Sequence, residues 1–299
     1  MGVTFSDYLF ATVAYADIFD YPLTADDLYF WCIKKTPRKN FRAGGIPGVV
    51  NHNYMLTLRG RQNITETYDR RRELSKEKRE IARRAGKWLR LIPSLTLVGI
   101  TGSAAVNNAT AGDDIDLFFI TARKTLWITR ALTTLLIDIL GIRRRPGDKK
   151  VTNKICLNMF MSEDALAIPK KEQDLYAAHE VLQMEPLWAR GNSYRRFLET
   201  NIWVKKLLPV AWEIKHFGRN NHPKASYFWT YVSVFFLKWF ERPAKFFQLW
   251  YMKKRRTHEV ITARMLRFHP QDVRHWVRVE FARRLLKRNI PLDNVFYGG

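Results

Sequence analysis

The chain is 299 residues long, 46% of them hydrophobic, and carries a formal net charge of +23. Such a chain can bury a sizeable core in two or three domains, and its charge favours polyanions such as RNA, DNA or an anionic membrane surface. Its two cysteines, Cys32 and Cys156, are isolated, which excludes a disulfide framework or a cysteine-rich metal site and indicates small buried hydrophobes in a reducing compartment. The N-terminus lacks the basic stretch of a signal peptide, so we expect a cytoplasmic protein.

Residues 1–60 are expected to form a first module. Apolar residues recur at helical spacing over residues 5–19, and a capping box that starts at Thr24 opens a second helix. Alternating residues over 49–58 then indicate a hairpin. Two helices followed by a hairpin resemble a winged helix, a fold that often binds nucleic acid. Residues 36–46 contain a proline and two glycines and cannot form a long recognition helix, so a purely structural role is the alternative.

One long charged helix is expected over residues 61–92. Its apolar positions include Trp88 and Leu89, and its arginines and glutamates stand at spacings that allow ion pairs along the helix. Most of the arginines are therefore expected on a solvated face, and a minority could face a groove for an acceptor.

The most informative stretch covers residues 95–121, LTLVGITGSAAVNNATAGDDIDLFFIT. Two apolar runs, typical of buried strands, enclose a Gly-Ser turn. Gly102 lets the backbone approach a ligand closely, and Ser103 is expected to cap a helix whose free N–H groups suit a phosphate. Asp114 and Asp116 are two residues apart, so in a strand their carboxylates emerge on one face. Two such oxygen ligands suit Mg²⁺ that escorts a nucleoside triphosphate (NTP).

An ordinary hairpin with an acidic, soluble turn is the alternative interpretation of this stretch. Asp113 and Asp114 alone would fit that interpretation. Asp116, however, lies inside the apolar run 115–120, where an unpaired carboxylate is costly unless a metal ion or another cation meets it. The position of Asp116 therefore favours a metal site.

These residues resemble the signature of the DNA polymerase beta-like nucleotidyltransferase superfamily: an apolar lead-in, Gly-Ser, ten intervening residues, then Asp-apolar-Asp-apolar. In this resemblance Gly102 and Ser103 form the phosphate-holding turn, and Asp114 and Asp116 are the metal carboxylates. The flanking text, DIFDYPLT, KICLNMF, AAHEVLQMEPLW and NIWVKKLLP, is similar to a group of uncharacterised prokaryotic nucleotidyltransferase-domain proteins. The resemblance implies transfer of a nucleoside monophosphate from an NTP to an acceptor hydroxyl, with pyrophosphate release, and names no acceptor.

A strand expected at residues 154–161 departs from the superfamily pattern. Members that elongate nucleic acids usually carry a third carboxylate there, which completes the metal site and can help take the acceptor proton. Here the matching stretch offers Asn158, and the nearest acids are Glu163 and Asp164 just beyond it. Three interpretations stay open: a two-carboxylate enzyme, an acid supplied from elsewhere, or a weakened active site.

Residues 126–140 are expected to form a helix on the sheet, and the arginines at 143–145 could hold a triphosphate or lie in a solvated turn. In the helix expected at residues 174–184, Tyr176 and Glu180 are one turn apart. They are candidates for nucleotide contact, since in the superfamily the helices after the palm commonly hold the base and acceptor. His179 between them is expected to be a packing residue.

The aromatic segment 227–252, YFWTYVSVFFLKWFERPAKFFQLWYM, is too short and too charged to cross a membrane. We expect two helices that meet at Pro243 and bury their aromatic side chains against protein. The side chains concerned are Trp229, Phe235, Phe236, Trp239, Phe246, Phe247 and Trp250. The basic run at residues 253–256 supports the alternative, an interfacial membrane anchor.

Together these features predict an α/β (α+β) fold with four parts. They are a winged-helix-like module (1–60), a connecting helix (61–92), a small mixed-sheet nucleotidyltransferase palm (93–170) and a helical C-terminal domain (171–299). The predicted function is Mg²⁺-dependent nucleotidyl transfer, with RNA or DNA as a possible acceptor. The alternative is a catalytically weakened fold that acts as a nucleic-acid-binding or membrane-surface module.

Overall fold

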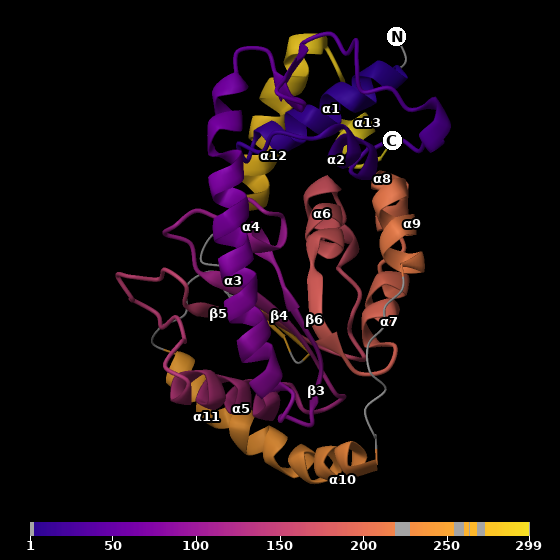
Figure 1. Ribbon diagram of the computed structural model, residues 1–299. Coiled ribbons are helices and arrows are strands. Elements are labelled where there is room, and N and C mark those ends of the chain that lie inside the picture. Colours follow the sequence, from indigo (N-terminus) through magenta and orange to yellow (C-terminus); the bar gives the residue numbers. More distant parts are fainter. Residues whose placement is uncertain (1–2, 219–227, 254–259, 263, 268–272, 299) are drawn as a thin grey trace.

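The computed structural model describes residues 3–218, 228–253, 260–262, 264–267 and 273–298. It is a mixed α/β structure in which helices surround a central sheet (Figure 1). The α-helices are α1 (Phe5–Asp17), α2 (Ala25–Phe30), α3 (Tyr68–Leu89), α4 (Gly102–Ala105), α5 (Leu126–Ile139), α6 (Leu175–Gln183), α7 (Ser193–Thr200), α8 (Val204–Leu207), α9 (Pro209–Phe217), α10 (Phe228–Leu237), α11 (Glu241–Met252), α12 (Val273–Leu285) and α13 (Leu292–Phe296). The strands are β1 (Val49–His52), β2 (Met55–Leu58), β3 (Leu95–Ile100), β4 (Ile115–Thr121), β5 (Ile155–Ser162), β6 (Glu185–Ala189), β7 (Val260–Ile261) and β8 (Met265–Arg267).

The central sheet contains six strands within these described ranges, in the order β6-β3-β4-β5-β8-β7. Strand β3 pairs antiparallel with β4 and with β6, whereas β4 and β5 run parallel. The predicted mixed sheet is therefore confirmed. Three of its strands, β6, β7 and β8, come from the region that was expected to be helical, so that expectation is wrong at these positions. Pro186 in β6 is tolerated because β6 is an edge strand, where one side of the backbone has no ladder partner.

The two faces of the sheet pack against different sets of helices. Leu117 and Phe119 of β4 lie in a cluster with buried residues of α3, α5 and α11, whereas Phe118 and Ile120 lie in a second cluster with residues of α1, α6 and α9. Successive side chains of a strand point to opposite faces, so Asp116 emerges on the same face as Phe118. That face is the one covered by α6 and the N-terminal helices.

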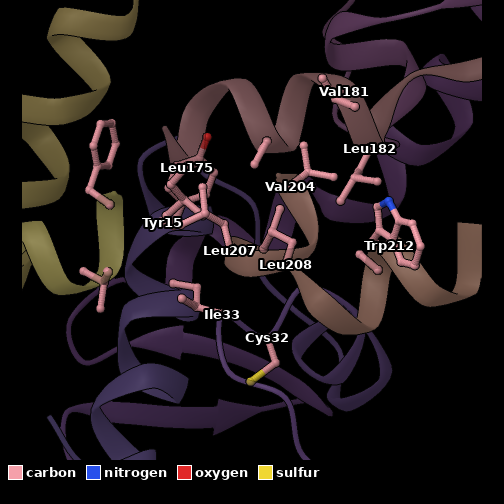
Figure 2. Close-up of a cluster of buried hydrophobic side chains, with 14 of the residues drawn as sticks. Tyr15, Cys32, Ile33, Leu175, Val181, Leu182, Val204, Leu207, Leu208 and Trp212 are labelled. Carbon is pink, nitrogen blue, oxygen red and sulfur yellow. The ribbon is translucent and has the colours of Figure 1, made fainter. Parts of the chain in front are cut away.

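The second cluster joins residues that are far apart in the sequence. Figure 2 shows side chains of α6, α8 and α9 gathered around one another, with residues of the N-terminal module beside them. Helix α12 also packs on α1: the ring of Phe281 lies edge-on to Tyr15, and Arg284 Nε donates to Asp17 Oδ2 over 2.8 Å. Since one hydrophobic cluster connects the first and last quarters of the chain, the four domain ranges given above stay predictions.

The N-terminal module contains the two predicted helices and the predicted hairpin of β1 and β2. Thr24 forms the predicted capping box with Asp27. In the segment that could not hold a long helix, the structure has a short 3₁₀ helix at Arg38–Asn40. The winged helix therefore stays a prediction, and between α2 and β1 the structure has only this short 3₁₀ helix.

Helix α3 starts at Tyr68, later than the predicted residue 61, because residues 62–67 form a 3₁₀ helix. Most of its arginines lie on a solvated face, as predicted: Arg70, Arg72, Arg83 and Arg84 are exposed. Two other basic side chains point into the protein. Lys78 is buried, and its Nζ donates to Asp113 O over 2.7 Å and to Asn153 Oδ1 over 2.8 Å. Arg79 donates to Ala104 O over 2.9 Å. The long helix thus supports the segments that lead into α4 and β4.

Candidate functional site

Asp114 and Asp116 lie at the start of β4, beside the parallel strand β5. The register places Asp116 opposite Cys156. One ligand atom from each of Asp114, Asp116 and Cys156 lies within 4.8 Å of the other two. The two carboxylates therefore converge, as their spacing predicts, while their role as metal ligands stays a prediction. Cys156 was missed, because from the sequence it had only the pattern of a buried hydrophobe.

The electrostatic state of this group is unusual. Burial, and after it the charge of Asp114, raise the pKa of Asp116 to about 7. Burial and the two aspartates also raise the pKa of the Cys156 thiol, so that it stays protonated and donates a hydrogen bond to Asp116. Cys156 is consequently a neutral donor at this site.

Arg144 is the nearest cation that the structure places on this pair. Its Nη1 lies 2.6 Å from Asp114 Oδ2 and 3.9 Å from Cys156 Sγ. Its neighbours Arg143 and Arg145 pair with Asp138 instead. Of the arginine run considered from the sequence, one side chain therefore reaches the site and two stabilise the turn that carries it.

The Gly102-Ser103 turn is only partly as predicted. Gly102 has a φ of +67°, and a Cβ at this position would lie 2.8 Å from Asp116 Oδ2, so both its backbone and its neighbour require glycine. Ser103 does not cap α4, which begins at Gly102 without a side-chain cap. Its Oγ donates instead to Asp113 Oδ2 over 2.7 Å.

Asp113 has a structural role in this turn. Its carboxylate accepts hydrogen bonds from the N–H and the hydroxyl of Thr110 as well as from Ser103. Burial opposes ionisation, but these hydrogen bonds outweigh it and lower the pKa of Asp113. The adjacent carboxylates Asp113 and Asp114 are thus separated in role, one holding the loop and the other facing Asp116.

Of the three residues considered as a third metal ligand, Asn158 lies near Asp116, whereas Glu163 and Asp164 do not. Asn158 is buried at the point where the register of β4 and β5 shifts, and it lies near Asp116 on the wall of a cavity. Glu163 and Asp164 follow the far end of β5, since Thr121 and not Asp116 pairs with Ser162. Asp164 accepts from Ser162 Oγ over 2.5 Å, and Glu163 lies 3.8 Å from Arg196. Neither of these acids is placed to complete the site.

A cavity of about 440 Å³ adjoins Asp116. It lies between the start of β4, α4, α6 and the N-terminal helices, and such a volume is typical of small-molecule sites. Its polar lining includes Asp27, Gly102, Ser103, Asn107, Asn108, Asp116, Asn158, Glu180, Gln183 and Lys215, and its aromatic lining includes Tyr15, Phe19, Tyr21, Phe30, Trp31, Tyr176 and Trp276. One cavity is therefore lined by the predicted turn at Gly102 and Ser103, by the predicted metal ligand Asp116 and by the two candidates of α6, Tyr176 and Glu180.

Glu180 is the second carboxylate of this cavity with a raised pKa. Burial, followed by the charge of Asp116, raises the pKa of Glu180 to about 7, while Arg274 and Arg267 oppose this shift. The charge of Asp116 on β4 thus disfavours ionisation of an acid on α6. A carboxyl group with a pKa near 7 can accept and release a proton at neutral pH.

Two further residues complete the lining. His179 is stacked on Tyr15 at 4.1 Å between ring centroids, and burial lowers its pKa to about 3, so it is a neutral packing residue as predicted. Among the described residues that line the cavity, Lys215 of α9 is the one basic side chain of the lysine or arginine type. Burial lowers the pKa of Lys215. No local motif pointed to Lys215, because only the tertiary packing of α9 brings it here.

Of the three residues that could hold a metal ion here, the two aspartates fit Mg²⁺ and Cys156 does not. Asp114 and Asp116 offer the hard oxygen atoms that Mg²⁺ prefers. Burial and the charge of Asp114 raise the pKa of Asp116, and a divalent cation bound to both carboxylates would favour their ionised forms. A protonated thiol is a poor ligand for this ion.

Comparison of the chain with protein-family models, with curated proteins and with solved structures finds no match. The resemblance to nucleotidyltransferases thus stays a prediction that the site itself has to support.

Proposed function

We propose that the protein transfers a nucleoside monophosphate from an NTP to an acceptor hydroxyl, with Mg²⁺ bound by Asp114 and Asp116 and with pyrophosphate as the second product. The observation that carries the proposal is the converging carboxylate pair, of which Asp116 is buried against a cavity of about 440 Å³. A buried acid is costly, and an acid with a raised pKa in a cavity is a common property of functional sites.

The charge of the cavity supports the need for a cation. The described lining of the cavity contains three carboxyl groups, those of Asp27, Asp116 and Glu180, and one lysine, Lys215. A triphosphate alone would meet net negative charge there, so NTP binding is expected to depend on a divalent ion. The aromatic side chains on the N-terminal side of the cavity offer flat faces for a nucleobase.

Glu180 supplies the proton acceptor in this proposal. The acceptor oxygen forms a bond to the α-phosphorus, the bond from that phosphorus to the pyrophosphate oxygen breaks, and the hydroxyl proton passes to Glu180. When bound, Mg²⁺ would offset the charge on the attacking and leaving oxygens. Glu180 thereby takes the part that Asn158 cannot take, which favours the interpretation of an acid supplied from elsewhere.

The first test is labelling of protein or RNA by radiolabelled NTP in the variant Asp116→Asn. We expect a loss of at least about 100-fold, because the substitution removes one charge from the metal-binding pair while the amide keeps nearly the same shape. Glu163→Gln is the matched control and should keep full activity, since Glu163 lies at the other end of β5. Full activity of Asp116→Asn would refute the metal role.

Glu180→Gln tests the proton acceptor separately. We expect kcat to fall by about 100-fold or more, and the ionisation near neutral pH to disappear from the pH profile of the residual activity. A Glu180→Gln enzyme whose pH profile is unchanged would leave Asp114 and Asp116 as metal ligands but exclude Glu180 as the base.

Binding of NTP without turnover is the second candidate function. It is favoured by Arg144, which already places a cation 2.6 Å from Asp114 and would compete with a metal ion there. This candidate predicts that an NTP stabilises the protein against heat equally well with Mg²⁺ and with a chelator. Stabilisation that requires Mg²⁺ favours the enzyme.

A further inference from the structure

The aromatic segment does not bury its rings as we expected from the sequence. Helix α10, the 3₁₀ helix Lys238–Phe240 and helix α11 follow one another along the end of the molecule opposite the N-terminal module (Figure 1). Eight large aromatic side chains in this segment are each at least 55% exposed: Phe235, Phe236, Trp239, Phe240, Phe246, Phe247, Trp250 and Tyr251. We call these eight residues the aromatic face. The side chain of Trp229 lies outside the described residues.

The inward side of the segment explains why the aromatic face points outward. Glu241 accepts hydrogen bonds from the backbone N–H groups of Trp127 and Ile128, at the start of α5, over 3.0–3.1 Å. Gln248 donates to Trp127 O over 2.7 Å, and Met252 is buried in the core beside them. Positions 241, 248 and 252 lie on one side of a helix, so these contacts fix its rotation.

Pro243 is not the point where the two helices meet, in contrast to the expectation from the sequence. It is the third residue of α11, in the first turn, where a helix needs no N–H donor. The interruption lies earlier, at the 3₁₀ helix Lys238–Phe240. The segment is therefore a nearly continuous rod along the surface, with no fold-back to cover the aromatic rings.

The aromatic face is larger than ordinary surface apolar patches. Eight aromatic side chains exposed to this degree present on the order of 1,000 Å², whereas the largest patch on a typical monomer is about 300–600 Å². None of the helices in the described part of the chain is long and apolar enough to cross a bilayer.

The charges that border the aromatic face indicate which partner it fits. Lys238, Arg242, Lys245 and Lys253 are exposed, and their spacings of four, three and eight residues place them along one flank of the helix. The segment 228–256 contains seven basic residues and one acid, and that acid is Glu241, which points inward. Lys254, Arg255 and Arg256 lie outside the described residues. A second copy of this face would bring two basic flanks together, which like-charge repulsion disfavours.

We propose that α10 and α11 dock the protein on the surface of an anionic phospholipid bilayer. Trp, Tyr and Phe side chains are suited to the boundary between head groups and acyl chains, and the flanking lysines and arginines attract anionic head groups. The body of the protein satisfies the polar side of the helix, which a free interfacial helix would expose to water. This docking does not depend on the proposed nucleotidyl transfer, because the cavity lies on the N-terminal side of the sheet.

Flotation of the full chain with vesicles tests the proposal. Wild-type protein should float with phosphatidylcholine vesicles that contain about 30% phosphatidylglycerol at about 150 mM salt, and should not float with phosphatidylcholine alone. Phe247→Ser combined with Trp250→Ser should reduce binding at least about tenfold. Lys245→Gln should reduce it about fivefold. Tyr54→Asn removes an exposed aromatic residue from the β1–β2 turn and should leave flotation unchanged.

Three results would overturn the proposal. The first is a failure of wild-type protein to float, and the second is flotation that the double variant retains. The third is a wild-type dimer in light scattering that the double variant converts to monomer, because the occupant of the aromatic face would then be a second copy of the chain. Melting curves of each variant, measured without vesicles, show whether the substituted proteins are folded.

Discussion

Acidic side chains are buried at the cavity, whereas aromatic side chains are exposed on α10 and α11. At the cavity, Asp116 and Glu180 are removed from water, and burial raises the pKa of both carboxyl groups. On α11, Phe247 and Trp250 remain in water while Gln248 between them is turned to the protein. Each arrangement reverses the usual distribution of polar and apolar groups and lowers the stability of the folded chain.

The acids at the cavity and the aromatic rings on α10 and α11 are held in place by different kinds of contact. Around Asp116 the fold holds the acids in place with a glycine of positive φ, a buried lysine and hydrogen bonds to the neighbouring loop. On α11 the inward contacts of Glu241 and Met252 hold the helix, and the aromatic residues themselves contribute little to its position. Substitutions at the cavity are therefore expected to change stability strongly and with pH, and substitutions of the aromatic face only weakly.

The largest effect is expected at the wall of the cavity, in the variant His179→Phe. The pKa of His179 is about 3 in the folded chain, against about 6.5 unfolded, so the unfolded state binds a proton first as the pH falls. The folded chain is therefore not destabilised by His179 above pH about 6.5. Its free energy of unfolding falls as the pH drops from about 6.5 toward 3, because protonation of His179 favours the unfolded state. At pH about 4.5 the contribution of His179 to the loss is on the order of 3 kcal/mol, so acidification should lower the stability of wild type relative to the phenylalanine variant by about this amount.

Urea unfolding at pH about 7.5 and about 4.5 measures this difference. Phenylalanine keeps a flat ring against Tyr15, so the variant should fold. His52→Phe, at an exposed site on β1, is the control and should follow the wild-type pH dependence. If His179→Phe and wild type lose the same stability on acidification, His179 is not held neutral by burial.

Asp116→Asn in the absence of divalent ions should have an effect of similar size, in the stabilising direction. A carboxyl group whose pKa rises from about 4 unfolded to about 7 folded keeps its proton in the folded state, so wild-type stability falls as the pH rises from 4 to 7. An amide does not ionise. At pH about 8 the variant should be more stable by about 4 kcal/mol, and at pH about 4 the two should be nearly equal.

Thermal melting with a chelator, and then with Mg²⁺, checks this prediction. Mg²⁺ should raise the melting temperature of wild type more than that of the variant, since only wild type has both carboxylates. A variant that is less stable than wild type at pH about 8 would mean that Asp116 is held by favourable interactions, and that the comparison between the two regions is wrong.

The sequence predicted most of the central fold, because its signals there are local. Two apolar runs and the Asp-apolar-Asp spacing located β3, β4 and the converging carboxylates, and an apolar helical run located α5. The short strands β6 and β8 escaped notice, since their pairing with β3 and β5 is a tertiary property and Pro186 argues locally against a strand. Glu180 was singled out only through the resemblance, and Lys215 and Cys156 were not, because their positions depend on packing between distant segments.

The burial of the aromatic segment was predicted wrongly for a physical reason. Composition suggested that so many rings must be covered, but composition does not tell which side of a helix faces the protein. Glu241 and Gln248 decide it, because their hydrogen bonds to the start of α5 are specific, and a rotation that buried Trp250 would break them. The decisive residues are polar and give no signal in a hydrophobic pattern.

Glu241→Gln tests that explanation, with a smaller expected effect. The carboxylate accepts from two N–H groups at the N-terminus of α5, where a negative charge is favourable, so its removal should lower the free energy of unfolding by about 1 kcal/mol. Glu73→Gln on the exposed surface of α3 is the control and should change it by less than about 0.5 kcal/mol. Equal effects of the two substitutions would show that Glu241 does not hold α11 on the protein.

The smallest effect is expected for Phe247→Ser combined with Trp250→Ser, which should change the free energy of unfolding by no more than about 0.5 kcal/mol. Both side chains are more than 60% exposed, so their removal returns little apolar area to water and leaves no cavity. Met252→Ala, at a buried position of the same helix, should cost about 2–5 kcal/mol and serves as the comparison. Chemical denaturation of the three proteins without lipid measures both values. If the double variant loses as much stability as Met252→Ala, the aromatic face is packed against protein in solution. The difference between the two regions would then disappear, and with it the reason to expect a lipid surface at α10 and α11.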